Sequence, residues 1–369
     1  MNRRDLLTAV MLAGAGALVG PAAALAQAGA SARPGPRNLI TDVAGLKVGQ
    51  AQDSAVRTGT TVILPDEAAV VAADVRGGGP ATRETDATEP QNLVHAFDAV
   101  VLSGGSVYGL AAPDGVVAWL GAHGRGYGLS PKPGTPKSPV IPSAALYDLA
   151  NGGNKAWGLR PPYWDLGLAA VQAASDHFEL GTAGAGYGAM AGSLKGGIGS
   201  ASVVTADGFT VGALVAVNSA GSVVAPGTRQ FWAAPYEIGN EFGGLGTSQL
   251  HAGPDDWGRP KPHPGARENT TLAVVATDAK LTSDEARRMA IMAQDGMARA
   301  IRPSHSPFDG DIVFAVATGR VDVPEPRAAI TARLGALAAD TLARAIARAV
   351  YEATPWPGSD VPTWRGLRS

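Results

Sequence analysis

The 369-residue sequence contains no cysteine. This absence excludes disulfide bonds, thiolate metal ligands, iron–sulfur clusters and a cysteine nucleophile together. A covalent catalyst would have to be a serine, a threonine, a lysine or a carboxylate. An excess of positive charge is also absent, because 30 Lys and Arg face 32 Asp and Glu, for a formal net charge of −2. We therefore expect no nucleic-acid partner and no general attraction to an anionic membrane.

Several motifs of common enzyme classes are missing or wrongly spaced. No stretch has the eight-residue phosphate-binding pattern that ends in Gly-Lys-Ser/Thr, and the six histidines form no His-Glu-x-x-His pair. The Ser-Gly-Gly-Ser run at 103–106 lacks the spacing of a hydrolase nucleophile elbow, and the glycines at 184–188 miss the dinucleotide-binding spacing. We expect neither a metal nor an organic cofactor.

The N-terminus has the pattern of an export signal. Arg3 and Arg4 precede an apolar stretch that runs to Leu25 and is interrupted by glycines, which is typical of a twin-arginine signal. Small-x-small sequences predict cleavage near Gln27 or Gly29. An uncleaved anchor is the alternative, although the glycine-rich segment is short for a bilayer span. We expect a signal peptide at 1–28, a leader at 29–38, a periplasmic or secreted protein, and no membrane contact after export.

Strands and helices are predicted to alternate along the rest of the chain. Apolar, β-branched runs predict strands at 60–64, 69–75, 99–103, 271–277 and 311–318. Helical spacing predicts helices from Pro113, from a capping box at 282–285, and over 328–351. Residues 209–218 and 222–225 predict a hairpin around Ser-Ala-Gly. The expected fold is one α/β domain of layered sheets and helices.

A loop rich in proline and glycine ends at Asn269-Thr270-Thr271, where a predicted buried strand begins. If the peptide bond before Thr270 were strained, the Thr270 hydroxyl could attack the Asn269 carbonyl, and hydrolysis of the ester would free a new N-terminus. The liberated α-amine has a reference pKa of about 7.7 to 8.0 and could serve as base for its own hydroxyl. Spacing alone favours a simpler interpretation, in which the two threonines merely begin a strand.

Two further groups carry candidate chemistry. Asp309-Gly310-Asp311 places carboxylates at i and i+2, which share a face if the backbone is extended, and such a pair could support a nucleophile or its amine. An ordinary Asp-Gly turn is the alternative. The amide of Asn218 could donate to a developing oxyanion, while a turn-forming asparagine is the simpler interpretation.

Six segments occur together in one order: ITDVAG at 40–45, DVRGGGP at 74–80, LSGGS at 102–106, GAG at 184–186, AVN at 216–218 and ATD at 276–278. Through these six segments and their order, the chain resembles the DmpA-like, self-processing L-aminopeptidase/D-amidase-esterase family. That family includes β-peptidyl aminopeptidases and the nylon-oligomer endohydrolase. The resemblance implies an N-terminal-nucleophile-like αββα fold of four layers, which is α/β or α+β in class. It also implies a single cut into a large chain, 39–269, and a small chain, 270–369.

The resemblance assigns roles to particular residues. It places the cut between Asn269 and Thr270 and makes Thr270 the nucleophile. The other residues that it implicates are Asn218 as the oxyanion or orienting amide, Tyr147 as a nearby hydroxyl, Asp309 and Asp311 as supports of Thr270, and Lys195. The spacing around Lys195 departs from the family pattern.

The function implied is a self-cleaving amide hydrolase that works through a threonyl acyl-enzyme on a small amide or peptide. The Asn-Thr-Thr and Asp-Gly-Asp runs are similar to the nylon-oligomer hydrolase, whereas residues 76–80 and 83–86 are closer to the aminopeptidases. Peptides, β-peptides, D-amino-acid amides and nylon oligomers therefore all stay open as substrates. A homotetramer is implied by the resemblance alone. The alternatives are an acyltransferase on the same scaffold and an uncut, non-catalytic periplasmic binding protein.

Overall fold

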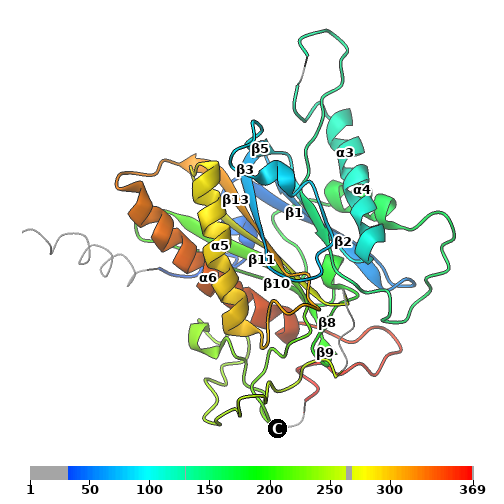
Figure 1. The fold of residues 1–369 in the computed structure, drawn as a ribbon, viewed down its shortest axis with the longest axis vertical. Helices are drawn as coiled ribbons and strands as arrows, with labels where there is room; N and C mark the ends of the chain where they lie inside the picture. The colour runs from blue at the N-terminus through cyan, green and yellow to red at the C-terminus, as the bar shows by residue number, and fades with distance from the viewer. Residues whose placement is uncertain (1–31, 129, 263–267, 368–369) are drawn as a thin grey trace, which may run out of the picture.

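The computed structural model describes residues 32–128, 130–262 and 268–367, and elements carry the labels of Figure 1. The signal peptide expected at 1–28 lies outside the described residues. No helix of the described part is long and apolar enough to cross a membrane.

Two mixed sheets form the centre of the molecule. In spatial order, the six-stranded sheet contains β10 (Gly197–Val204), β11 (Thr210–Asn218), β12 (Thr270–Ala279), β13 (Ile312–Val321), β3 (Ala69–Val75) and β5 (Ala96–Phe97). The five-stranded sheet contains β1 (Leu46–Asp53), β2 (Thr58–Pro65), β6 (Val100–Ser103), β7 (Ser143–Ala145) and β4 (Thr82–Arg83). A small hairpin joins β8 (Met190–Ala191) to β9 (Leu194–Lys195).

The helices cover the two outer faces. They are α3 (Ala112–Ala122), α4 (Tyr163–Gln172), α5 (Ser283–Ala300) and α6 (Arg327–Tyr351), and the short 3-10 turns are η1 (Ile40–Asp42), η2 (Asp86–Thr88), η3 (Ser106–Ala111), η4 (Gly184–Gly186) and η5 (Ala234–Tyr236). Figure 1 shows α5 and α6 on one side of the strands and α3 and α4 on the other.

Side-chain alternation along the strands creates the layers. On β12, Ala273 and Val275 pack into the core beneath α5 and α6, while Leu272 and Val274 belong to the core between the two sheets. On β2, Val62 and Leu64 pack towards α3 and α4, whereas Ile63 between them faces the inner core. Because successive strand residues point to opposite faces, each strand serves two cores. This arrangement confirms the four-layer αββα fold.

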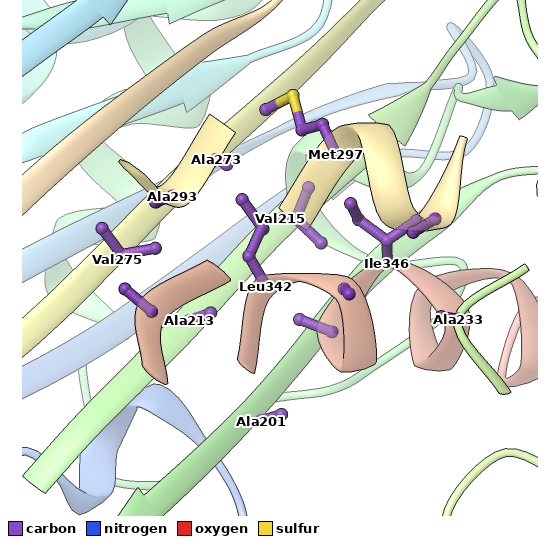
Figure 2. Packing of buried hydrophobic residues seen from close by; sticks show 14 of the residues in the cluster. Ala201, Ala213, Val215, Ala233, Ala273, Val275, Ala293, Met297, Leu342 and Ile346 are labelled. Carbon is purple, nitrogen blue, oxygen red and sulfur yellow. The ribbon is translucent and has the colours of Figure 1, made fainter. Parts of the chain in front are cut away.

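The α5–α6 pair packs closely on the six-stranded sheet. A Cβ at Gly296 would collide with the backbone carbonyl of Ala339, so the glycine allows the two helix backbones to approach. Figure 2 shows Leu342 and Ile346 of α6 beside Met297 of α5 and the side chains of the sheet. Burial of a leucine of this kind stabilises the fold by about 1.5 to 3 kcal/mol.

Most predicted elements are confirmed, including the capping box that opens α5 at Thr282. The predicted hairpin after β11 is wrong. β11 pairs with β10 and β12, whereas Ser222 and Val224 form isolated bridges to Arg302 and Phe231. A local turn signal suggested the adjacent segment as partner, but β12, some fifty residues later, supplies a longer buried strand for β11.

Candidate active site

The site forms where three chain segments meet at one end of the central strands of the six-stranded sheet. β11 ends at Asn218, which lies directly opposite Thr270, the first residue of β12. β13 runs parallel to β12, so the residues just before β13 lie at the same end of the strands as Thr270. Asn269 forms a bridge with one of them, Asp309. The structure therefore brings together residues that are about fifty and forty positions from Thr270 in sequence.

The Asn269–Thr270 peptide bond is buried, and its carbonyl is already hydrogen-bonded. The Gly310 N–H donates to the Asn269 carbonyl oxygen over 2.8 Å. The Thr270 hydroxyl donates to the same oxygen, so this hydroxyl and the preceding carbonyl are in contact. A fixed N–H at that oxygen is suited to stabilising the negative charge that develops when a carbonyl is attacked.

Glycines make this geometry possible. A Cβ at Gly310 would lie 2.7 Å from Thr270 Oγ1 and 2.9 Å from the Gly79 carbonyl oxygen. The Gly79 N–H in turn donates to the Asp309 carbonyl oxygen over 2.8 Å, and a Cβ at Gly77 would collide with the Asp311 nitrogen. The glycine run at 77–79 thus wraps closely around the Asp-Gly-Asp turn.

Asp309 is a buried carboxylate held by two donors. Its Oδ1 accepts a hydrogen bond from the Ala220 N–H at 3.0 Å, and its Oδ2 accepts one from the Ser306 hydroxyl. Burial raises the pKa of Asp309, and the negative charge of Asp311 raises it further, whereas both hydrogen bonds and the Lys261 cation lower it. The two acids therefore lie close enough to influence each other, as their i, i+2 spacing predicts.

Asp311 connects β12 to a histidine. Its Oδ1 accepts from the Thr271 N–H at 2.8 Å, and its Oδ2 accepts from the His305 N–H at 3.0 Å. The His305 Nδ1 lies 2.9 Å from the same Oδ2. Asp311 thereby fixes the backbone immediately after Thr270.

The Asn218 amide has a defined orientation. Its Oδ1 accepts from the Met190 N–H at 2.9 Å, and the Lys261 ammonium lies 3.5 Å from the same oxygen. Its Nδ2 donates to the carbonyls of Tyr147 at 3.0 Å and Glu268 at 3.3 Å. The amide nitrogen is thus held at the carbonyl of the residue that precedes Asn269.

Two cavities flank the Asn269–Thr270 peptide bond. One, of about 180 Å³, is lined by polar groups that include Asn269, Asn218 and Lys261. The other, of about 260 Å³, is lined by Thr270 and by a mixture of polar residues, such as Ser106, and apolar residues, such as Leu110. Tyr147 lines both cavities and so lies beside the Asn269–Thr270 bond.

Lys195 has a different setting. It is fully buried on β9, and its ammonium donates to the carbonyls of Gly186 at 3.2 Å, Ala189 at 3.0 Å and Gly196 at 2.7 Å. Burial lowers its pKa to about 7, although the charge of Asp148 acts in the opposite direction. These bonds brace the β8–β9 hairpin, whose first residue binds the Asn218 amide.

Sequence patterns did not indicate three neighbours of the site, Lys261, His305 and Ser306. Lys261 lies in an aperiodic loop, and His305 has no second histidine at a recognisable spacing. Ser306 was also missed, although a serine three residues before an aspartate is a local hydrogen-bonding signal that could have indicated it. Among residues 32–128, 130–262 and 268–367, no group of three or more histidines and carboxylates is placed to hold a metal ion.

The chain is similar to several known proteins. The sequence profile of Peptidase family S58 matches residues 38–363. An uncharacterized aminopeptidase of Mycobacterium tuberculosis is 43% identical over 354 residues, covering 89% of this chain and 98% of the relative. The 6-aminohexanoate-oligomer endohydrolase of Kocuria sp. is 28% identical over 331 residues, covering 85% and 86%.

Solved structures show the same fold. A beta-aminopeptidase of Burkholderia sp. has a TM-score of 0.63 at 25% identity, covering 87% of this chain and 88% of that one. The L-aminopeptidase D-Ala-esterase/amidase of Ochrobactrum anthropi, described as a variant of the Ntn hydrolase fold, has a TM-score of 0.61 at 22% identity, covering 89% and 90%. The expected resemblance and N-terminal-nucleophile-like fold are confirmed. The chain therefore belongs to Peptidase family S58 and is a hydrolase of amide bonds.

Proposed function

We propose that this hydrolase activates itself by cleaving the Asn269–Thr270 bond and then uses Thr270 as its nucleophile. The observation that carries the proposal is the contact of the Thr270 hydroxyl with a carbonyl whose oxygen already accepts the Gly310 N–H. Attack of Oγ1 on the Asn269 carbonyl carbon moves an electron pair onto that oxygen. Collapse expels the Thr270 nitrogen, which takes up the hydroxyl proton, and water hydrolyses the resulting ester.

Turnover repeats this chemistry on a substrate. The freed α-amine of Thr270, with a reference pKa of about 7.7 to 8.0, accepts the hydroxyl proton as Oγ1 attacks the substrate carbonyl. It then passes that proton to the substrate nitrogen, which leaves as the C–N bond breaks. The Asn218 Nδ2 becomes available to the oxyanion once Glu268 is on a cut end, because Glu268 supplies one of its two carbonyl partners in the uncut chain. Asp309 and Asp311 hold the surrounding backbone, and water releases the acyl group from Thr270.

The two chains, 39–269 and 270–369, would remain one domain after the cut. β12 hydrogen-bonds to β11 of the large chain, and α6 packs on β10 and β11. Separation would expose the core beneath α5 and α6, so association is strongly favoured.

Substrate choice is proposed from the relatives and the cavities. The relatives include aminopeptidases and a 6-aminohexanoate-oligomer endohydrolase. Part of the wall of the cavity beside Thr270 is apolar, formed by Pro80, Val107 and Leu110, and this part suits an aliphatic acyl group. Hydrolysis of a panel of amino-acyl anilides beside a 6-aminohexanoate oligomer would rank these classes. Added amine that is captured as product would instead indicate an acyltransferase.

Export and assembly complete the proposal. A twin-arginine signal at 1–28 would deliver the folded protein to the periplasm, and family resemblance favours a homotetramer. Replacing Arg3 and Arg4 by lysine should leave unprocessed precursor inside the cell, whereas undiminished mature protein in the periplasm would refute the twin-arginine assignment. Sedimentation of the purified protein tests the tetramer.

The decisive experiment uses two variants of the nucleophile. Thr270→Ala removes the hydroxyl and should leave a folded single chain without amidase activity, while Thr270→Ser should still cleave itself. Intact-mass spectrometry of the wild type should show a small chain of 100 residues that begins at Thr270. A fragment that begins elsewhere, or an active Thr270→Ala variant, would overturn the mechanism. An uncut wild type without activity would favour the binding-protein alternative.

A further inference from the structure

A lysine on the large chain contacts the amide expected to bind the oxyanion. The Lys261 Nζ lies 3.5 Å from Asn218 Oδ1, and the lysine lines the cavity of about 180 Å³ beside Asn269. This distance is long for a hydrogen bond, but a cation interacts favourably with an amide oxygen over it. The lysine takes no part in the proposed proton transfers, so its position needs another explanation.

The chemistry of the neighbours fixes which way the amide points. The two groups at Oδ1, the Met190 N–H and the Lys261 ammonium, can only donate. The two groups at Nδ2, the carbonyls of Tyr147 and Glu268, can only accept. A flipped amide would set its NH₂ against two donors and its oxygen against two carbonyls. The cation therefore penalises the wrong orientation more strongly than a neutral donor would.

The loop is built to hold Lys261 in place. Pro260 and Pro262 flank it, which restricts the backbone on both sides, and the Lys261 N–H donates to the Ala220 carbonyl over 2.8 Å. Ala220 also donates its own N–H to Asp309. The lysine backbone is thus tied to the segment that holds the acid of the site.

We propose that Lys261 is a positioning residue of this active site, whose ammonium holds the Asn218 amide with its Nδ2–H directed at the reacting carbonyl. The inference rests on the proposed function, because it requires Asn218 to serve the oxyanion. Once the cut end withdraws, Nδ2 keeps only the Tyr147 carbonyl of its two hydrogen-bond acceptors. The ammonium at Oδ1 then becomes more important for keeping the amide in this orientation. A cation at Oδ1 also polarises the amide, which strengthens the Nδ2–H as a donor.

The charge environment of Lys261 gives the proposal a pH signature. Burial lowers the pKa of Lys261 to about 8, opposed by the carboxylates of Asp309 and Glu268, and Asp148 lies in the wall of the same cavity. The ammonium is therefore lost as the pH rises through about 8. The α-amine of Thr270 acts in the opposite direction, because its deprotonation makes it a base and raises activity.

The experiment compares the pH profiles of the mature wild type, Lys261→Met and Lys261→Arg on an amino-acyl anilide. Lys261→Met should lower kcat about tenfold with little change in KM, since the amide acts in the transition state. Lys261→Arg should retain most of the activity. The wild type should lose activity above about pH 8, while Lys261→Arg should keep its activity there because a guanidinium stays charged.

Lys280→Met is the matched control, because the Lys280 side chain is 70% exposed and the same atoms are removed. Circular dichroism and intact mass confirm that each variant is folded and cut. Wild-type kcat in Lys261→Met, or a loss of kcat in Lys261→Arg as large as that in Lys261→Met near neutral pH, would refute the inference. Failure of the proposed function is seen separately, as activity in Thr270→Ala.

Discussion

A single added methyl group at Gly310 should slow the proposed self-cleavage step. In Gly310→Ala, the new Cβ would lie 2.7 Å from Thr270 Oγ1, against at least 3.4 Å for an ordinary contact. The hydroxyl or the turn must therefore move by about 0.7 Å, and the Gly79 carbonyl at 2.9 Å restricts the opposite direction. The Gly310 N–H is kept, so the perturbation acts on the nucleophile rather than on the donor to the Asn269 oxygen.

The expected loss of rate follows from the required displacement. A misplacement of about 1 Å costs about 100-fold in well-oriented reactions, so we expect self-cleavage to slow by between about 10-fold and 100-fold. Overpacking of this kind costs about 1 to 3 kcal/mol in stability, which the fold should survive. The assay follows conversion of the full chain to its two fragments by intact-mass spectrometry after synthesis.

Gly121→Ala provides the control, because a Cβ at Gly121 meets no atom within 4 Å and the residue lies in α3, away from the junction. This variant should cleave at the wild-type rate. Gly310→Ala that cleaves as fast as the control, with an unchanged melting temperature, would show that Thr270 does not need its observed position.

Three further outcomes are expected. Asp309→Asn and Asp311→Asn should each slow hydrolysis at least about tenfold, which corresponds to about 1.4 kcal/mol in the barrier. Wild-type rates in folded variants would instead support the interpretation of Asp309-Gly310-Asp311 as an ordinary turn. Because burial raises the pKa of Asp148 to about 6, the folded state binds its proton more tightly than the unfolded chain does, and stability should fall as the pH rises from about 4 to 6. Asp148→Asn, whose amide can still pair with the Thr58 hydroxyl, should reduce this fall in urea unfolding of a Thr270→Ala background, and an unchanged pH dependence would contradict the assignment. Leu342→Ala, in the core beneath α5 and α6, should cost about 2 to 5 kcal/mol of unfolding free energy in the same background, and a cost under about 1 kcal/mol would mean that this core repacks.

The sequence predicts the elements of the site better than their meeting point. The loop before Thr270 and the buried strand after it are visible as a change in periodicity, and the structure has that strand as β12. The i, i+2 spacing of Asp309 and Asp311 is equally local. Both predictions rest on residues a few positions apart, where backbone geometry decides which side chains share a face.

Pairing between distant segments could not be predicted in the same way. Asn218 lies opposite Thr270 because β11 and β12 pair in an antiparallel register across a loop of about fifty residues. The turn signal after Asn218 pointed instead to a hairpin that does not form. Lys261 was missed for a related reason, since a proline-flanked residue in an aperiodic loop gives no indication of its tertiary neighbours.

The strand order also determines which side of a cut at Asn269–Thr270 keeps its position. β12 lies between β11 and β13, so Thr270 is held by backbone hydrogen bonds on the strand side and by the Asp311 contact to Thr271. Asn269 precedes the strand and is held mainly by the bridge to Asp309, by the Gly310 N–H and by the bond from its Nδ2 to the Phe308 carbonyl. The new amine would therefore remain fixed while the new carboxylate could withdraw. An asymmetric junction of this kind allows one cut to create a base beside the nucleophile and to open space for a substrate.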